Sequence, residues 1–180
     1  MKILAGSLRG RPFDQPNSRS VRPLSEKVRA AIFDVIGAPV GFTVLDAYAG
    51  SGAAGFEALS RGAALVDAIE ANPRAARAIG QNARTLGLDW GYILHQITVA
   101  TWLAAPAQTP AQPRYQLIIA DPPYAQLEPD ILERLATFLT PGGVLALSHA
   151  SKLPSPALSG IMLAAHKTYG DTALSFFRQD

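Results

Sequence analysis

Asp121-Pro122-Pro123-Tyr124 combines residue types that can bind and orient a small planar group. The two prolines fix φ and remove two backbone donors, so the segment cannot continue a helix or a central strand. It predicts a rigid loop that presents carbonyl oxygens, one carboxylate and one aromatic ring. Such a loop suits a planar group with an exocyclic amine, because the oxygens accept its N–H bonds while the ring stacks on its face. A stiff surface turn is the alternative, since these residue types are common in turns.

A glycine-rich segment earlier in the chain favours the ligand-binding interpretation. Residues 43–48 have the pattern of a buried strand, and residues 53–60 have the pattern of the following helix. Between them, Gly50, Gly52 and Gly55 fit G-x-G-x-x-G, which allows close approach of a ligand to backbone N–H groups. The next predicted strand, 64–69, ends in Glu70, which is placed to accept hydrogen bonds from a ribose hydroxyl pair.

Asp46 separates the two classes of protein that carry such a glycine pattern. It lies four residues before the first glycine, close to the expected ligand. A carboxylate there is unfavourable beside a pyrophosphate but favourable beside the cationic amino acid moiety of S-adenosylmethionine. The chain also offers no second domain for a hydride acceptor. We therefore expect S-adenosylmethionine as the cofactor, with a small dinucleotide-dependent oxidoreductase as the alternative.

Length and composition exclude several other classes. A chain of 180 residues with 48% hydrophobic content predicts one domain with a substantial core. The lack of cysteine excludes disulfides, thiolate metal sites and a cysteine nucleophile. There is no apolar run long enough for a membrane span and no secretory signal, so we expect a cytoplasmic protein. The three histidines are too scattered to indicate a metal site.

Positive charge is concentrated at the N-terminus. Residues 1–29 hold seven of the 16 Lys and Arg residues but two of the 14 Asp and Glu residues. A basic arm beside a base-binding pocket predicts a polyanionic partner, most simply nucleic acid. A solvated tail without a partner is the alternative.

The remaining pattern predicts alternating helices and strands. Helices are expected over 25–36, 72–86 and 131–139, strands over 92–95, 115–120 and 144–148, and a hairpin over 161–169 and 172–178. This alternation predicts an α/β fold with a mostly parallel, doubly wound sheet. Both motifs then fall at the carboxyl ends of strands, where such sheets bind ligands.

Motifs spread over nearly the whole chain match one known family. They are residues 3–6, 9–11, 22–29 with Phe33, 45–52, 57–63, 70–72, 121–124 and 167–172. The chain thereby resembles the RsmD-type bacterial methyltransferases, which modify N2 of guanine 966 in 16S rRNA. The resemblance implies a Rossmann-like class I methyltransferase with a seven-stranded sheet and a C-terminal antiparallel hairpin. It implies a methyltransferase domain over 25–180, after a basic extension over 1–24 that we expect to be a hairpin contacting RNA.

The resemblance also implies roles for individual residues. The cofactor would be bound by Asp46, Tyr48, Gly50, Ser51, Gly52, Glu70 and Thr98. The target base would be received by Asp121, Pro122, Pro123 and Tyr124. The rRNA phosphates would be bound by Arg9, Arg11, Arg22, Lys27 and Arg29. The chain departs from the family at Thr98, where an acidic or amide side chain often binds the adenine amine, and at Ser148-His149, where an acid is frequent.

The implied partner is 16S rRNA within a small-subunit particle, with no metal, membrane or obligate protein partner. Two alternatives stay open. The loop at 121–124 is shared with adenine-N6 and other amine methyltransferases that act on DNA or another RNA. A ribosome-assembly factor that keeps the fold with weak catalysis is the second alternative.

Overall fold

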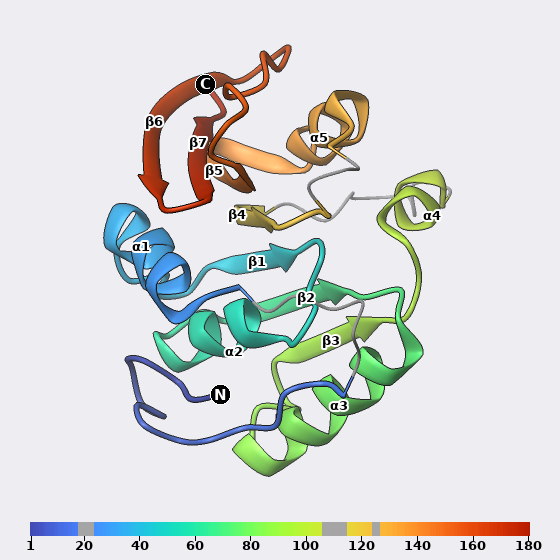
Figure 1. Ribbon diagram of the computed structural model, residues 1–180. Helices are drawn as coiled ribbons and strands as arrows, with labels where there is room; N and C mark the ends of the chain where they lie inside the picture. Colours follow the sequence, from blue (N-terminus) through green and yellow to red (C-terminus); the bar gives the residue numbers. More distant parts are fainter. Residues whose placement is uncertain (18–23, 106–114, 124–126) are drawn as a thin grey trace.

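The computed structural model describes residues 1–17, 24–105, 115–123 and 127–180 of the chain (Figure 1). Its centre is a seven-stranded sheet with the order β3-β2-β1-β4-β5-β7-β6. The strands are β1 Thr43–Asp46, β2 Leu65–Ile69, β3 Tyr92–His95, β4 Tyr115–Ala120, β5 Leu139–Ala150, β6 Met162–Tyr169 and β7 Thr172–Arg178. Strands β1 to β5 pair in parallel, whereas β7 is antiparallel to both β5 and β6. The predicted fold class and terminal hairpin are confirmed.

Helices cover both faces of the sheet (Figure 1). They are α1 Glu26–Ile36, α2 Ala53–Ser60, α3 Pro73–Leu86, α4 Val99–Ala104 and α5 Pro129–Ala136. Side chains of α1, α2 and α3 share one apolar core, and those of α4 and α5 share the other. In β1, Val44 faces the first core and Leu45 the second, because successive strand residues point to opposite faces.

Capping residues in the sequence determine where α1 and α3 begin and end. The Ser25 side chain accepts a hydrogen bond from Val28 N at the start of α1. Asn72 caps α3 in the same way, Pro73 occupies its first turn, and Gly87 ends it with a left-handed φ of 69°. Both helices begin and end where the sequence predicts.

Four elements, β1, β5, α5 and α4, differ from the prediction. β1 ends at Asp46 and not at 48, because residues 47 and 48 already form a turn. β5 begins at Leu139, because Leu139 already pairs with Tyr115 and the irregular turn at Gly142 is taken up within the strand. The helix expected to reach 139 therefore ends at Ala136. The short helix α4 was not predicted, since its six residues leave too little periodicity to distinguish it from a loop.

The N-terminal segment packs against the domain. Lys2 and Pro12 form an isolated antiparallel bridge, and the side chains of Ile3 and Phe13 are buried in the first core. The backbone N–H groups of Leu4 and Ala5 donate to the buried carboxylate of Glu57, at 2.8 and 2.9 Å. Residues 1–17 are thus tied to α2 by both apolar and polar contacts. Within the described ranges, no helix is long and apolar enough to cross a membrane.

Candidate active site

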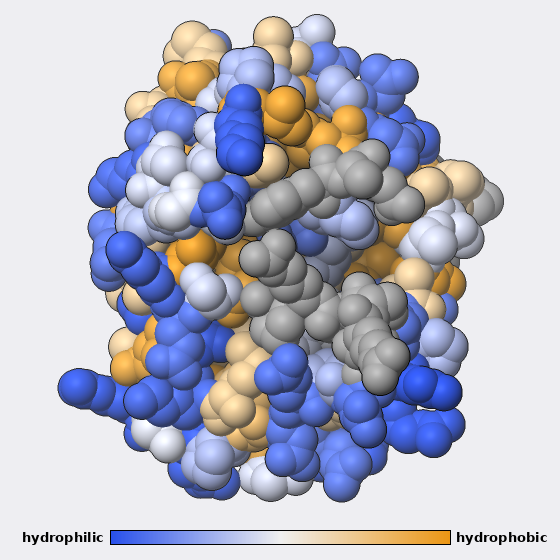
Figure 2. Space-filling model, in the orientation of Figure 1, coloured by the Kyte–Doolittle hydropathy of each residue, from blue (hydrophilic) through white to orange (hydrophobic). Residues whose placement is uncertain are grey.

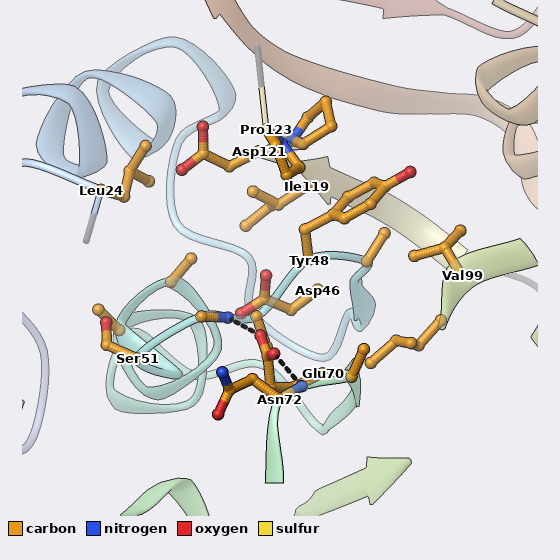
Figure 3. A pocket seen from close by; sticks show the side chains of 18 of the residues that line it. Leu24, Asp46, Tyr48, Ser51, Glu70, Asn72, Val99, Ile119, Asp121 and Pro123 are labelled. Carbon is orange, nitrogen blue, oxygen red and sulfur yellow. Dashed lines mark hydrogen bonds between the residues drawn. The ribbon is translucent and has the colours of Figure 1, made fainter. Parts of the chain in front are cut away.

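The carboxyl ends of β1, β2 and β4 border a cavity of about 550 Å³ (Figure 3). This edge includes the point where the strand order reverses between β1 and β4, the usual ligand site of a doubly wound sheet. Nine of the predicted cofactor and base residues line it: Asp46, Tyr48, Gly50, Ser51, Glu70, Thr98, Asp121, Pro122 and Pro123. Gly52 is not among the lining residues, and Tyr124 lies outside the described residues.

Asp46 is the buried carboxylate at the centre of the cavity. Its side chain is 3% exposed and accepts one hydrogen bond, from Gly55 N at 3.1 Å. Burial raises the pKa of Asp46 to about 7; the Gly55 bond opposes this shift, while the charges of Asp121 and Glu70 add to it. A cationic group placed beside Asp46 would therefore lower the free energy of its ionised form.

Close packing explains two glycines of the turn between β1 and α2. Gly52 has a φ of 77°, and an added Cβ would lie 2.9 Å from the ring of Phe56. A Cβ on Gly55 would lie 2.7 Å from the ring of Tyr92. Gly55 thus lets α2 pack closely on β2 and β3, and Gly52 leaves room for Phe56 of α2 and Ile79 of α3 beneath the turn whose residues Gly50 and Ser51 border the cavity.

Glu70 follows β2 and braces the glycine turn. Its carboxylate accepts hydrogen bonds from Gly50 N at 2.7 Å and from Asn72 N at 2.6 Å, the dashed lines in Figure 3. Each carboxylate oxygen has a second lone pair. Glu70 can therefore hold the turn and still accept hydrogen bonds from a ribose diol.

Thr98 lies on the cavity wall, but its hydroxyl caps α4. The Thr98 Oγ1 atom accepts from Thr101 N at 3.0 Å and is 2.8 Å from Thr101 Oγ1. The neighbouring lining residues Ile69, Ile97 and Val99 are apolar. This end of the cavity is thus better suited to pack against a flat apolar group of a ligand than to form hydrogen bonds with it.

The Asp-Pro-Pro loop begins at the end of β4, beside Asp46. In the register of β1 with β4, Asp46 pairs with Ile119, two residues before Asp121. Pro122 is buried and Pro123 is exposed at the opening. In Figure 3, Asp46 lies between Glu70 and the Asp121 loop. One cavity therefore joins the predicted cofactor residues to the predicted base-binding loop.

The structure adds lining residues that the sequence did not assign. Leu24, Ser25 and Val28 bring the start of α1 to the cavity, and Thr172 brings the β6–β7 turn. Thr172 lies in the 167–172 motif that supports the family resemblance. This motif could have indicated a role for Thr172 at the site. Leu24, Ser25 and Val28 lie in the 22–29 motif, which was likewise a signal, although their local pattern is that of an ordinary capped helix.

The predicted RNA-binding residues differ in their exposure to solvent. Arg9, Arg11 and Lys27 are exposed, and Arg22 lies outside the described residues. The prediction for Arg29 is wrong, because its side chain is fully buried beneath the N-terminal segment. Arg29 Nη2 donates to Lys2 O at 2.6 Å, and Arg29 Nε lies 3.6 Å from Glu57 Oε2.

The donor and acceptor set of the cavity fits S-adenosylmethionine. Three carboxylates, Asp46, Glu70 and Asp121, face one cavity, and mutual repulsion contributes to the raised pKa of Asp46. Neither Glu57 nor Asp67, whose carboxylates form ion pairs with described residues, lines this cavity. A ligand with cationic centres, a ribose diol and a flat apolar ring matches this arrangement better than a pyrophosphate does.

Comparison with known proteins agrees with this topology. The profile of the family described as conserved hypothetical protein 95 matches residues 1–178. YlbH of Bacillus subtilis is 29% identical over 184 residues, 99% of both chains. The ribosomal RNA small subunit methyltransferase D of Escherichia coli K12 is 32% identical over 148 residues, 81% of this chain and 70% of that protein. The structure of TTHA0928 from Thermus thermophilus has a TM-score of 0.82 at 30% identity over 98% of both chains.

The match extends over almost the whole chain, and the sheet order is that of a Rossmann-like class I methyltransferase. The chain therefore belongs to the conserved hypothetical protein 95 family, the family of the RsmD-type methyltransferases.

Proposed function

We propose that this protein methylates N2 of a guanine, position 966, in the 16S rRNA of the small ribosomal subunit. The observation that carries the proposal is the single cavity shared by Asp46, Glu70 and the Asp121-Pro122-Pro123 loop. The rRNA substrate is supported by the E. coli relative, whose name states that it is a small-subunit rRNA methyltransferase. The guanine and its N2 amine are supported by the family motifs in the sequence.

The cofactor is S-adenosylmethionine, which supplies an electrophilic methyl group on a sulfonium when bound. Asp46 would stabilise the cationic part of the cofactor, and Glu70 would accept hydrogen bonds from its ribose. The apolar residues Ile69, Ile97 and Val99 would pack against the adenine. These residues would fix the methyl group at near-attack distance from the acceptor nitrogen, which removes an entropic part of the barrier.

The Asp121 loop would orient and activate the acceptor amine. The N2 lone pair of guanine is delocalised into the ring, so this nitrogen is a poor nucleophile. The Asp121 carboxylate and the Pro122 carbonyl would accept its two N–H bonds, favour lone-pair character on nitrogen and stabilise the developing positive charge. The N–C bond forms as the C–S bond breaks with its electron pair going to sulfur, and the nitrogen then loses a proton to Asp121 or water.

The target guanine would enter the cavity unstacked, because a paired and stacked base hides the edge that carries N2. Tyr124 would stack on the base, a contact worth roughly 1–3 kcal/mol in single-strand sites. A small-subunit particle would present this guanine in a fixed position.

The decisive experiment uses labelled S-adenosylmethionine with small subunits that lack the modification and, in parallel, with naked 16S rRNA. Digestion to nucleosides and mass spectrometry should place the label in N2-methylguanosine, and more of it with subunits than with naked rRNA. Label in N6-methyladenosine would contradict the guanine assignment. Cofactor binding without label in either RNA would contradict the proposed substrate and favour a non-catalytic assembly role.

A further inference from the structure

Helix α3 carries a row of arginines on one exposed face. Its basic residues are Arg74, Arg77 and Arg84, all exposed, and the helix contains no acidic residue. At 100° per residue these three side chains and Gln81 fall within an arc of about 80°. Figure 2 shows hydrophilic residues gathered over the lower part of this face, where α3 and the N-terminal segment lie. We call Arg74, Arg77 and Arg84 the α3 arginine face.

The composition of this face is unusual for a merely solvated helix. Solvated helix faces commonly alternate basic and acidic residues three or four positions apart, which stabilises the helix. Here Arg74 and Arg77 are a like-charged pair at that spacing, which is slightly destabilising. Among the described residues, none of the ion pairs involves an α3 arginine. The face therefore keeps its positive charge available to an external anion.

The α3 arginine face begins at the candidate active site. Asn72, the N-cap of α3, lines the cavity, and Arg74 follows it by two residues. From Arg74 to Arg84 the helix extends about 15 Å away from the cavity. At the far end, Arg11 Nη2 donates to Thr85 O at 3.2 Å, so an exposed arginine of the N-terminal segment continues the row.

The guanidinium chemistry favours phosphate as the anion. Arginine presents a planar fork of N–H donors that binds phosphate oxygens in pairs, and all the basic residues of this row are arginines. Described contacts place two acids beside α3: Glu70 accepts from Asn72 N at the start of the helix, and Asp14 is held at Asn82 through its backbone atoms. Asn82 is about 100° around the helix from Gln81, so Asp14 lies to one side of the row.

We propose that the α3 arginine face, continued by Arg11, binds the phosphates of the RNA strand that leads away from the methylated guanine. This inference rests on the proposed function, because it takes the occupant of the cavity to be a base of that strand. The proposal assigns an RNA contact to the methyltransferase domain. This contact would add to the one predicted from the sequence for the basic N-terminal extension.

The first test compares Arg77→Gln, Arg84→Gln and their double variant with the wild type. The double variant should raise the KM for small subunits about tenfold at unchanged kcat, and should reduce the slope of log KM against log salt by about 2. Arg178→Gln is the matched control: it removes the same charge from an exposed position on β7, opposite Val144 of β5. Unchanged cofactor affinity and melting temperature would confirm that the variants fold.

A second test uses the lack of cysteine in the chain. Gln81→Cys would carry a tethered iron–EDTA probe in the middle of the row on α3, and Arg178→Cys would carry the same probe at the end of β7, the strand next to the β6 edge of the sheet. Strand cleavage close to the methylated nucleotide is expected from the first conjugate and not from the second.

The outcomes separate this inference from the proposed function. Wild-type protein that methylates the rRNA, together with a double variant of unchanged KM and salt slope, would overturn the α3 assignment alone. Equal effects from Arg178→Gln, or equal cleavage from both conjugates, would do the same. A wild type that does not methylate rRNA would overturn the proposed function.

Discussion

Two buried carboxylates on opposite sides of α2 have contrasting surroundings. Glu57 accepts hydrogen bonds from Leu4 N and Ala5 N and pairs with Arg61 at 2.8 Å and Arg29 at 3.6 Å. Asp46 accepts one hydrogen bond from a backbone N–H and faces two further carboxylates across a cavity. The protein thus supplies the counter-charges of Glu57 itself, whereas no residue in the described ranges forms an ion pair with Asp46, whose charge a cationic ligand would balance.

This difference distinguishes a structural acid from a binding acid. Removing the charge of Glu57 should weaken the fold, because it leaves the buried guanidinium of Arg29 without its partner. Removing the charge of Asp46 should strengthen the fold and weaken cofactor binding. The comparison therefore predicts changes of opposite sign in the free energy of unfolding when the charge of Glu57 or of Asp46 is removed.

Glu57→Gln should have the largest effect on stability. The free energy of unfolding should fall by about 3–5 kcal/mol, because Arg29 Nε and Nη1 have no hydrogen-bond partner among the described residues and depend on the charge of Glu57. Chemical denaturation at pH 7 measures this loss. Glu26→Gln, an exposed acid in the first turn of α1, is the control and should cost less than about 1 kcal/mol. Equally small losses of unfolding free energy in Glu57→Gln and Glu26→Gln would contradict the structural role of Glu57.

Asp46→Asn should reduce cofactor affinity roughly 10- to 100-fold, since an amide keeps the bond to Gly55 N but loses the charge. Isothermal titration with S-adenosylmethionine measures this loss, with the exposed Asp34→Asn as the control.

The same variant should be more stable than the wild type at pH 8. Burial raises the folded-state pKa of Asp46 to about 7, so its stabilising contribution is complete below pH 4 and is lost as pH rises through 7. Asparagine cannot ionise, so the variant should gain on the order of 4 kcal/mol at pH 8, and the gain should shrink as the pH falls and vanish below about pH 4. A less stable variant at pH 8 would contradict the assignment of Asp46 as a binding acid.

The pH dependence of cofactor binding is a smaller effect that sharpens the comparison. Protonation of Asp46 in the free protein competes with a cationic ligand, so the affinity should fall about tenfold from pH 8 to pH 6. The amino group of the cofactor also titrates in this range. The part of the pH dependence that disappears in Asp46→Asn is therefore the part due to Asp46. Identical pH profiles for the two proteins would argue against a raised pKa at this site.

The sequence predicted the elements whose ends are set by local chemistry. Capping by Ser25 and Asn72, the glycines after β1 and the prolines after β4 act over a few residues, and the structure has them as expected. Nine of the eleven predicted cofactor and base residues line one cavity, because parallel strands bring their carboxyl ends to one edge.

The differences arose where a tertiary contact decides the role of a side chain. Arg29 belongs by charge to the basic N-terminus, but it shares a helix face with Ile32, Phe33 and Ile36, which pack against the core. Helical periodicity could therefore have marked it as buried. The α3 arginines were not predicted as a site. The net charge of the chain after residue 29 does not reveal that three arginines share one face of α3. The hydroxyl of Thr98 is used by a helix too short to predict.

The proposed reaction requires that one cavity hold the cofactor at Asp46 and the acceptor amine at Asp121. Asp121→Ala tests this requirement directly, by single-turnover methylation of small subunits together with calorimetric titration of S-adenosylmethionine. The rate should fall by at least about 100-fold, the usual cost of removing a preorganised electrostatic contact to a transition state. The cofactor dissociation constant should stay within about threefold of the wild type, well under the loss of a charge-assisted bond. A variant that methylates at the normal rate would contradict the assignment of the amine-binding loop.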